Sequence, residues 1–337
     1  MEINDFAMMV PMKYYDDPEP TIGTSAFDKR LEMIENADGS RIATVKHDGD
    51  WGCLIHYSKG HNLIRSRSLS KITGVYGDYT EKLPQIAREM DKWPDRTVIL
   101  AELCFDEPHA SANTAGTILR CLAKRAIERQ KIKPLKAVAF DMLMLDGCDL
   151  TSDGYEDRFT SLESFLALYK NEFVYPTKSF DNNFMERADE IIVAGGEGLV
   201  IQYRNNPYMP GTRTAWKTLK LKQTMPHTEL KVLRTLEPTK VYDGDMPESW
   251  PYKLEDGTLV TKPYFKGWKN GVVVDFRGVE VSVTSGLTDD DKEYLASDEA
   301  QKLIAAGKLY AEVKAMQINS RGALRHPALI RLRDDYE

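Results

Sequence analysis

The sequence predicts an α+β protein of two domains, in which helices accompany mainly antiparallel sheets. The first observation is length, because 337 residues exceed the roughly 100–200 residues of one ordinary domain. The second is a change of pattern near Pro226, where alternating helices and apolar strands give way to short strands separated by turns. We therefore expect a first domain over residues 1–225 and a second over residues 226–337.

The first domain reads as helices alternating with apolar strands. Helical periodicity covers residues 25–36, 80–92, 114–130, 160–169 and 183–194. In the third of these segments, the face predicted to point inward holds Leu119, Leu122, Ala123, Ala126 and Ile127. Strands are predicted over residues 42–45, 53–55, 62–69, 97–103, 136–145, 197–201 and 216–222.

The second domain is predicted to be a small β-barrel. Five segments alternate or are rich in β-branched residues: 230–236, 271–277, 279–284, 311–318 and 329–333. One helix is expected among them over residues 289–306, capped by Thr288. Five strands and a helix in roughly 110 residues suit a Greek-key barrel such as the OB-fold.

Composition excludes several classes of protein. The 45 basic and 52 acidic residues give a net charge of −7, which on its own argues mildly against a nucleic-acid partner. No apolar run approaches the roughly 18 residues of a membrane span, and no basic segment precedes an apolar one at the N-terminus. The four cysteines form no CxxC pair, so reduced thiols are expected. These features predict a cytoplasmic protein without a membrane partner.

Basic residues are nevertheless concentrated in two segments. Residues 118–136 include Lys124, Arg125 and Arg129, and residues 212–222 include Lys217. Solvated helix and strand faces explain the first segment as well as a surface that grips a nucleic-acid backbone does. Composition alone therefore does not distinguish a solvated face from a surface that binds nucleic acid.

Lys46 ends an aliphatic strand at a turn. Asp48-Gly49 follows it and leads into another apolar stretch, which predicts a β-hairpin with the lysine at the lip of the turn. Taken alone, a lysine in this place reads as a solvated charge.

Three of the later apolar strands carry one acid each, namely Glu102, Asp141 and Glu197. An acid on an apolar strand is costly to bury unless it binds a cation or meets a base. Each acid taken singly reads as a member of a satisfied ion pair. Together with Lys46 and the basic strand 216–222, the three indicate a site for phosphate and metal.

A lysine can attack phosphorus only when its amine is neutral, so its pKa must be lowered by its surroundings. Lys220 and Lys222 lie two residues apart on a predicted strand, so they share a face and can supply the necessary positive field. Phe140, next to Asp141, can stack on a purine.

Lys46-His47-Asp48-Gly49 opens a series of stretches in a fixed order. It is followed by Ser66-Arg67, Ala101-Glu102-Leu103, Phe140 to Gly147, Glu197 to Ile201, Trp216 to Lys222, and Gly322 to Pro327 with Arg331. The series resembles the ATP-dependent DNA ligases, a family of covalent nucleotidyltransferases with KxDG, FDLLYLDG and EGLVIK motifs. The closing stretch is similar to the end of short, two-domain phage enzymes. The resemblance implies a nucleotidyltransferase (adenylation) domain followed by an OB-fold domain.

The resemblance also implies a role for each matching residue. Lys46 is the residue that takes AMP as a phosphoramidate, and Asp48 and Gly49 belong to its nucleotide-binding motif. Glu102 contacts the ribose and, with Glu197, holds a metal ion. The other implied contacts are Phe140 on adenine, Lys220 and Lys222 on the α-phosphate, Arg67 on the nucleotide or the DNA 5′-phosphate, and Arg325 on pyrophosphate.

The implied reaction seals nicks in duplex DNA. ATP adenylylates the lysine, AMP passes to the 5′-phosphate at the nick, and the 3′-hydroxyl attacks to release AMP. The resemblance implies Mg²⁺ or Mn²⁺ as the metal, and we expect a monomer that binds nicked DNA through Arg67, Lys124, Arg125, Arg129 and Lys217. An RNA ligase or an mRNA-capping-type nucleotidyltransferase is the alternative enzyme, and an inactive protein that binds nucleic-acid ends is the alternative of another class.

The sequence departs from the family pattern at several positions. Trp51 stands where the family usually has an arginine, and Gln202 replaces the lysine that commonly closes EGLVIK. With Trp216 as an anchor, Lys217 could take the role given to Lys220. None of these changes removes the nucleophile or the metal-binding acids, so the sequence predicts an active enzyme.

Overall fold

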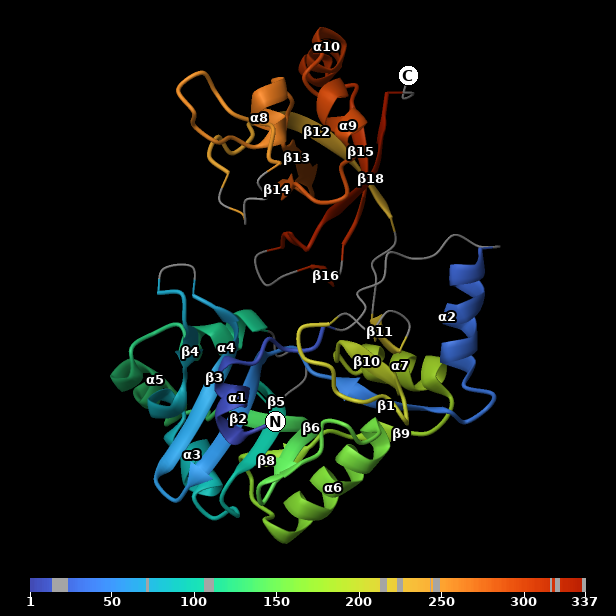
Figure 1. Cartoon of the computed structure of the whole chain (residues 1–337). Coiled ribbons are helices and arrows are strands. Elements are labelled where there is room, and N and C mark those ends of the chain that lie inside the picture. The colour runs from blue at the N-terminus through green and yellow to red at the C-terminus, as the bar shows by residue number, and fades with distance from the viewer. Residues whose placement is uncertain are drawn as a thin grey trace. The chain divides into compact units, whose positions relative to one another are not determined.

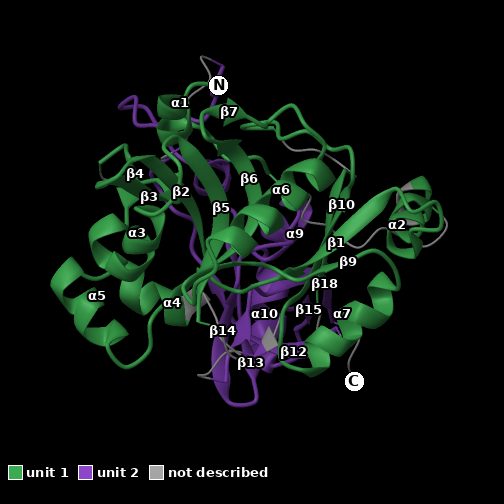
Figure 2. Cartoon of the chain, turned by 90° about the horizontal axis from the view of Figure 1, so that it is seen from below, with its two compact units in different colours: residues 1–222 green, residues 223–337 purple. Residues whose placement is uncertain are grey.

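The computed structural model describes residues 1–13, 24–70, 73–105, 112–212, 217–222, 227–242, 244, 249–315, 317–318 and 322–334, except for the side chains of residues 26, 27, 112, 113 and 317. The chain divides into two compact units, Met1–Lys222 and Gln223–Glu337 (Figures 1 and 2). The predicted boundary at Pro226 lies outside the described residues. Among those described, no helix is long and apolar enough to span a bilayer.

A seven-stranded sheet dominates the first unit, with the order β4-β3-β2-β5-β6-β7 and β8 added in parallel beside β6. The other neighbouring pairs are antiparallel, as predicted. The strands are β2 (Asp50–Ser58), β3 (His61–Leu69), β4 (Tyr76–Asp78), β5 (Thr97–Cys104), β6 (Lys136–Leu145), β7 (Cys148–Asp149) and β8 (Val174–Pro176).

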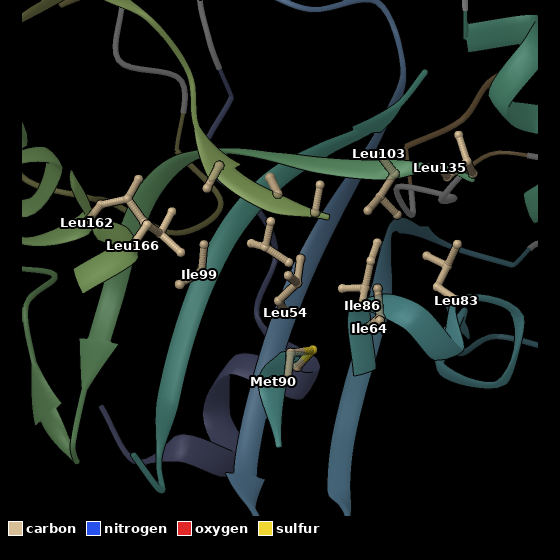
Figure 3. Packing of buried hydrophobic residues seen from close by; sticks show 14 of the residues in the cluster. Leu54, Ile64, Leu83, Ile86, Met90, Ile99, Leu103, Leu135, Leu162 and Leu166 are labelled. Atoms are coloured by element: carbon tan, nitrogen blue, oxygen red, sulfur yellow. The ribbon is translucent and has the colours of Figure 1, made fainter. Parts of the chain in front are cut away.

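One face of this large sheet is covered by helices. They are η1 (Thr80–Lys82), α3 (Pro84–Met90), α4 (Ala112–Leu119), α5 (Ala123–Gln130) and α6 (Tyr155–Leu168). Figure 3 shows Leu54 and Ile99 of the sheet in one cluster with Ile86 and Met90 of α3. Because side chains alternate along a strand, Ile99, Ala101 and Leu103 of β5 all enter this core, together with Leu54 of β2.

The opposite face carries the N-terminal segment. Helix α1 (Ile3–Met8) buries Ile3 and Phe6, and Met9 and Met12 continue the apolar surface beyond it. These side chains pack on a cluster that includes the alternate residues of the central strands, such as Cys53 and Leu100.

A second, four-stranded sheet completes the first unit, with the order β11-β10-β1-β9. Its strands are β1 (Arg41–Lys46), β9 (Ser179–Phe180), β10 (Gly198–Tyr203) and β11 (Thr218–Lys222). Helices α2 (Ser25–Glu35) and α7 (Phe184–Val193) pack on it through a separate core that includes Met33, Phe184 and Leu199. Two sheets therefore make up the unit, each with a core, and Ile42 of β1 joins them by packing in the core of the large sheet.

The hairpin predicted around Lys46 is wrong. Strand β1 pairs with β9 and β10, whereas β2 pairs with β3 and β5, so residues 47–49 carry the chain from the small sheet to the large one. A Cβ at Gly49 would lie 2.5 Å from the carbonyl oxygen of Leu103 and 2.8 Å from Cys104 Cβ. Glycine is required there because the crossing chain passes directly against β5, and no two-residue hairpin turn is formed.

The single helix predicted over residues 114–130 is also wrong. The chain breaks between α4 and α5, with Leu122 in an extended conformation. Leu119 and Ala126 face inward as predicted, but Leu122 is 83% exposed and Ile127 38% exposed. The break turns α5 so that Ala126 and Gln130, four residues apart, form its buried side.

The second unit is built on a five-stranded antiparallel sheet with the order β14-β13-β12-β15-β18. Its elements are β12 (Thr228–Leu236), α8 (Lys262–Lys266), β13 (Gly271–Phe276), β14 (Val279–Val283), α9 (Asp289–Tyr294), α10 (Asp298–Ala306), β15 (Tyr310–Lys314), β16 (Gln317–Ile318), β17 (Leu324–Arg325) and β18 (Ala328–Arg333). A parallel bridge joins Ser285, just after β14, to Ala328 of β18, and Leu329 N–H donates to the carbonyl of Ser285 at 2.8 Å. The two edge strands of the sheet are thus connected at one end.

Thr288 caps a helix as predicted, because its hydroxyl accepts from Asp291 N–H at 3.1 Å. The helix predicted over 289–306 is divided, however. Helix α9 ends at Tyr294, and Ser297 caps the separate helix α10 by accepting from Ala300 N–H at 3.2 Å. A second capping residue inside the periodic segment is the local cause of the break.

Candidate functional site

A cavity of about 530 Å³ lies in the first unit, with walls from both sheets. The small sheet supplies Lys46 and Lys220 among its lining residues. The large sheet supplies Asp50, Trp51, Glu102 and Phe140. The crossing at residues 47–49 therefore brings the lysine of the first motif to a cavity that strands of both sheets enclose.

Lys46 forms an ion pair with Glu197 inside this region. Nζ of Lys46 lies 2.5 Å from Oε2 of Glu197, and the side chains are 18% and 10% exposed. Gly198, the cross-strand partner of Lys46, has a φ of 134°, and a Cβ there would lie 2.1 Å from the carbonyl oxygen of Leu221. Only glycine fits at position 198, because β11 passes so close to it. The close approach of β11 thereby fixes the backbone next to Glu197.

Glu102 lies across the cavity on β5. Gly49 N–H donates to its Oε1 at 3.2 Å. Burial raises the pKa of Glu102 to about 7, and the charges of Glu197 and Asp50 add to that effect, while Lys46 and the Gly49 hydrogen bond oppose it. A cation entering the cavity would relieve the repulsion between these carboxylates.

Asp50 belongs to the same acidic region, although the sequence motifs did not single it out. Its Oδ2 is buried and accepts no hydrogen bond from a described residue. Burial raises the pKa of Asp50, Asp48 raises it further, and Arg120 at the end of α4 opposes the rise. Only the position of Asp50 directly after the KxDG-like stretch could have drawn attention to it.

Two carboxylates could hold a divalent cation here. No group of three acid, histidine or cysteine side chains among the described residues forms a preformed metal site. Mg²⁺ is, however, often held by one or two carboxylates while substrate phosphates and waters complete its coordination. Glu197, whose Oε2 is paired with Lys46, and Glu102 are the two carboxylates that fit that arrangement.

The third strand acid, Asp141, does not belong to the site. It is fully buried, and Arg158 of α6 binds both of its oxygens, with Nε to Oδ1 at 2.8 Å and Nη2 to Oδ2 at 3.0 Å. The expectation that Asp141 contributes to a phosphate-and-metal site is therefore wrong, because a bidentate partner already neutralises it.

Phe140 and Trp51 form aromatic walls of the cavity. Both rings also pack against the apolar cluster on the face of the large sheet that carries α1. The indole of Trp51 lies against the Arg65 guanidinium, whose Cζ is 5.3 Å from the ring centroid. Trp51 thus packs on the protein and also faces the cavity.

His47 and Thr177 link the crossing segment to the small sheet. His47 Nε2 lies 3.0 Å from Thr177 Oγ1, and the Thr177 hydroxyl donates to the carbonyl of Val45 at 3.2 Å. His47 lines the cavity, whereas Asp48 is not part of its lining. Sequence reasoning gave no role to His47, since this motif position carried no expectation.

The structure shows which lysine of the basic strand lies at the cavity. Lys220 lines the cavity opposite Val200, its cross-strand partner. Lys222 pairs with Gly198 and lies outside the lining, and Lys217 is exposed. Trp216, the proposed anchor, lies outside the described residues.

The remaining predicted residues are more scattered. Arg67 is exposed and lines the cavity from β3. Lys124 and Arg125 are exposed on α5, whereas Arg129 donates to the carbonyl of Thr117 and so ties α5 to α4. Arg325 lies on β17 in the second unit.

Comparison with known proteins relates this site to one family. The sequence profile of the ATP-dependent DNA ligase domain matches residues 24–222. A probable DNA ligase of Dictyoglomus thermophilum is 31% identical over 202 residues, which cover 58% of this chain and 33% of the relative. A DNA ligase of Archaeoglobus fulgidus is 26% identical over 325 residues, covering 88% of this chain and 50% of the relative. The chain thus spans between a third and half of the length of these relatives.

Solved structures show the same fold at low sequence identity. A structure of Lig E DNA ligases, described as DNA binding with a minimal scaffold, has a TM-score of 0.60 at 17% identity and covers 88% of this chain and 93% of that one. A second, named Pmar-Lig_PreS3, has a TM-score of 0.65 at 17% identity and covers 96% of this chain and 68% of that one.

Proposed function

Because the chain belongs to the ATP-dependent DNA ligase family, we propose that it seals nicks in duplex DNA with ATP as the source of AMP. The observation that carries the proposal is the position of Lys46. Its amine enters a cavity shared with Glu102, Phe140 and Lys220, and it is paired with Glu197.

In the first step of the proposed reaction, Lys46 attacks the α-phosphorus of ATP. A bond forms between Nζ and phosphorus, and the bond from that phosphorus to pyrophosphate breaks. The amine must lose a proton first, and Glu197 at 2.5 Å is placed to hold it. Lys220, on the same side of the cavity, can neutralise charge on the α-phosphate as it develops.

The nucleotide would be held by the residues around the lysine. We assign Phe140 to the adenine and Glu102 to the ribose, because both line the cavity beside Lys46. Arg67 reaches the cavity from β3, where it can meet a phosphate of ATP or of DNA. For Asp48, Gly49 and Lys222 we propose the nucleotide contacts, and for Arg325 the pyrophosphate contact, on the strength of their motifs alone.

We propose Mg²⁺, with Mn²⁺ as a substitute, as the metal ion. Glu102 and Glu197 would bind it together with phosphate oxygens. The ion would neutralise charge on the triphosphate.

AMP would then pass from Lys46 to the 5′-phosphate, and the 3′-hydroxyl would displace it to close the nick. Exposed Lys124 and Arg125, together with Lys217, would hold the DNA backbone. We further propose that the second unit is an OB-type barrel, since the bridge between Ser285 and Ala328 joins its edge strands. One chain would act as a monomer.

Mass spectrometry of the purified protein after incubation with ATP and Mg²⁺ tests the first step. The expected result is an AMP adduct on Lys46 that is absent from Lys46→Ala. A wild-type chain that never takes up AMP but binds DNA ends would instead be a binding protein.

Sealing assays on labelled nicked DNA and nicked RNA, with ATP or GTP, test the substrate. We expect sealing of DNA nicks with ATP. Labelling by GTP alone, or sealing of RNA but not DNA, would establish an RNA ligase or a capping-type enzyme.

A further inference from the structure

The N-terminal segment precedes the family match at residues 24–222, yet it is built into the first unit. Ile3, Phe6, Met9 and Met12 are 8%, 0%, 5% and 3% exposed. They pack in the cluster against which the cavity walls Trp51 and Phe140 also rest. The back of the cavity is therefore supported by residues that lie outside the family domain.

Arg65 connects this segment to the cavity. Its side chain is buried, with Nε donating to the carbonyl of Phe6 at 2.9 Å and Nη2 to that of Met9 at 2.6 Å. Its Nη1 donates to the carbonyl of Ser66 at 3.1 Å. These bonds fix the planar guanidinium in orientation, because its donors form a rigid fork.

The fixed guanidinium lies close to two aromatic rings. Its Cζ lies 4.1 Å from the centroid of Tyr76 and 5.3 Å from that of Trp51. Cation–π attraction of this kind strengthens where water is excluded. Trp51 is thereby held at its place in the cavity wall, where it is also the cross-strand partner of Glu102.

We propose that Trp51 packs against bound ATP beside Glu102, and that Arg65, held by the N-terminal segment, is the positioning residue for its indole. This inference rests on the proposed adenylylation of Lys46. An indole cannot supply the charge of an arginine, so its contribution is a flat apolar surface for the ribose and base. Trp51 and Phe140 then line the nucleotide site from adjacent parts of one sheet face.

The test is the ATP dependence of AMP uptake by the full chain in single-turnover labelling. Trp51→Ala is expected to raise the ATP concentration for half-maximal uptake on the order of tenfold, with a smaller change in the maximal rate. Trp51→Phe should recover most of the loss, because it keeps a ring. Arg65→Lys should show the same defect as Trp51→Ala, and the double variant should be no worse than the single ones.

Arg41→Lys is the matched control. Arg41 is equally buried and lies 4.5 Å from the ring of Tyr203, but it is outside the cavity lining. It should leave the ATP dependence unchanged even if it lowers the melting temperature.

Failure of the two proposals can be told apart. A wild-type chain that takes up no AMP overturns the proposed function. A wild type that takes up AMP while Trp51→Ala keeps normal ATP dependence overturns the role of Trp51, as does a defect confined to nick sealing. If Arg65→Lys does not fold, the Trp51 pair of variants still decides the role of the indole.

Discussion

Lys46 Nζ and Glu197 Oε2 lie 2.5 Å apart on neighbouring elements of the small sheet, with little exposure of either side chain. Each charge is stabilised mainly by the other, because few water molecules can reach either side chain. Removing one member of such a pair strands the other charge in a poorly solvated place. The same two residues are therefore expected to matter for stability as well as for chemistry.

Lys46→Ala should lower the free energy of unfolding by about 1–3 kcal/mol, since it leaves the Glu197 carboxylate without its cation. Adding Glu197→Gln should recover most of that loss while AMP uptake remains absent. Urea unfolding of the single and double variants measures both effects. Lys92→Ala, which breaks the surface pair of Lys92 with Glu89, should change stability by less than about 1 kcal/mol. Equal losses of unfolding free energy in Lys46→Ala and Lys92→Ala would contradict the expectation.

Glu102→Gln should make the protein more stable at high pH. The folded-state pKa of Glu102 is about 7, above its ordinary value of 4.5, so the folded protein binds more protons than the unfolded chain between these values. The wild type therefore loses stability as pH rises from about 4.5 to 7, by roughly 2–3 kcal/mol, and Gln escapes this loss. Melting curves at pH 5 and pH 8 in the absence of metal compare the two proteins. A difference that is equal at both pH values would show that the carboxyl is not titrating in this range.

Asp141→Asn should destabilise the protein by about 3–5 kcal/mol, because Arg158 would keep its buried charge without a counterion. AMP uptake per folded molecule should stay close to that of the wild type. Chemical unfolding together with labelling of the folded fraction separates the two outcomes. If the variant is as stable as the wild type but takes up no AMP, Asp141 belongs to the metal site after all.

Lys124→Ala with Arg125→Ala should weaken binding to nicked DNA. The slope of log affinity against log salt should fall by about 1 for each DNA phosphate that the variant no longer neutralises. Titrations at several salt concentrations measure that slope. Arg129→Ala is expected to act mainly on stability, since Arg129 already donates to the Thr117 carbonyl. If the slope of log affinity against log salt is unchanged in the double variant, α5 does not contact the DNA.

The order of motifs along the chain is enough to find most residues that the structure brings together. Lys46, Glu102, Phe140 and Lys220 all line one cavity, and each stands in a local pattern of apolar strand and charge that the sequence displays. Strand bounds are also predictable, with residues 136–145 forming β6 as expected. Local alternation depends on nearest neighbours, which are visible in the sequence directly.

Pairing between strands or charges that are distant in the sequence cannot be predicted from local patterns. An Asp-Gly turn after an aliphatic strand is typical of a hairpin, and only the third dimension shows that β1 and β2 join different sheets. Asp141 resembles Glu102 and Glu197 in its local pattern because nothing near it in sequence announces Arg158, seventeen residues later. The partner of a charge is a property of packing, so the sequence pattern alone cannot separate the structural acid from the acids of the site.

The crossing at residues 47–49 has a consequence for substrate selection. Lys46, Glu197 and Lys220 are carried by one sheet with its own core, and Glu102, Trp51 and Phe140 by another. The width of the cavity is therefore the spacing between two sheets, which are joined where Ile42 of β1 packs into the core of the large sheet. Substitutions deep in either core, without touching any ligand, would widen or narrow that gap. Under the proposed function, resizing Met33, Phe184 or Leu199 is expected to change which nucleotides are accepted, while every residue of the cavity wall stays in place.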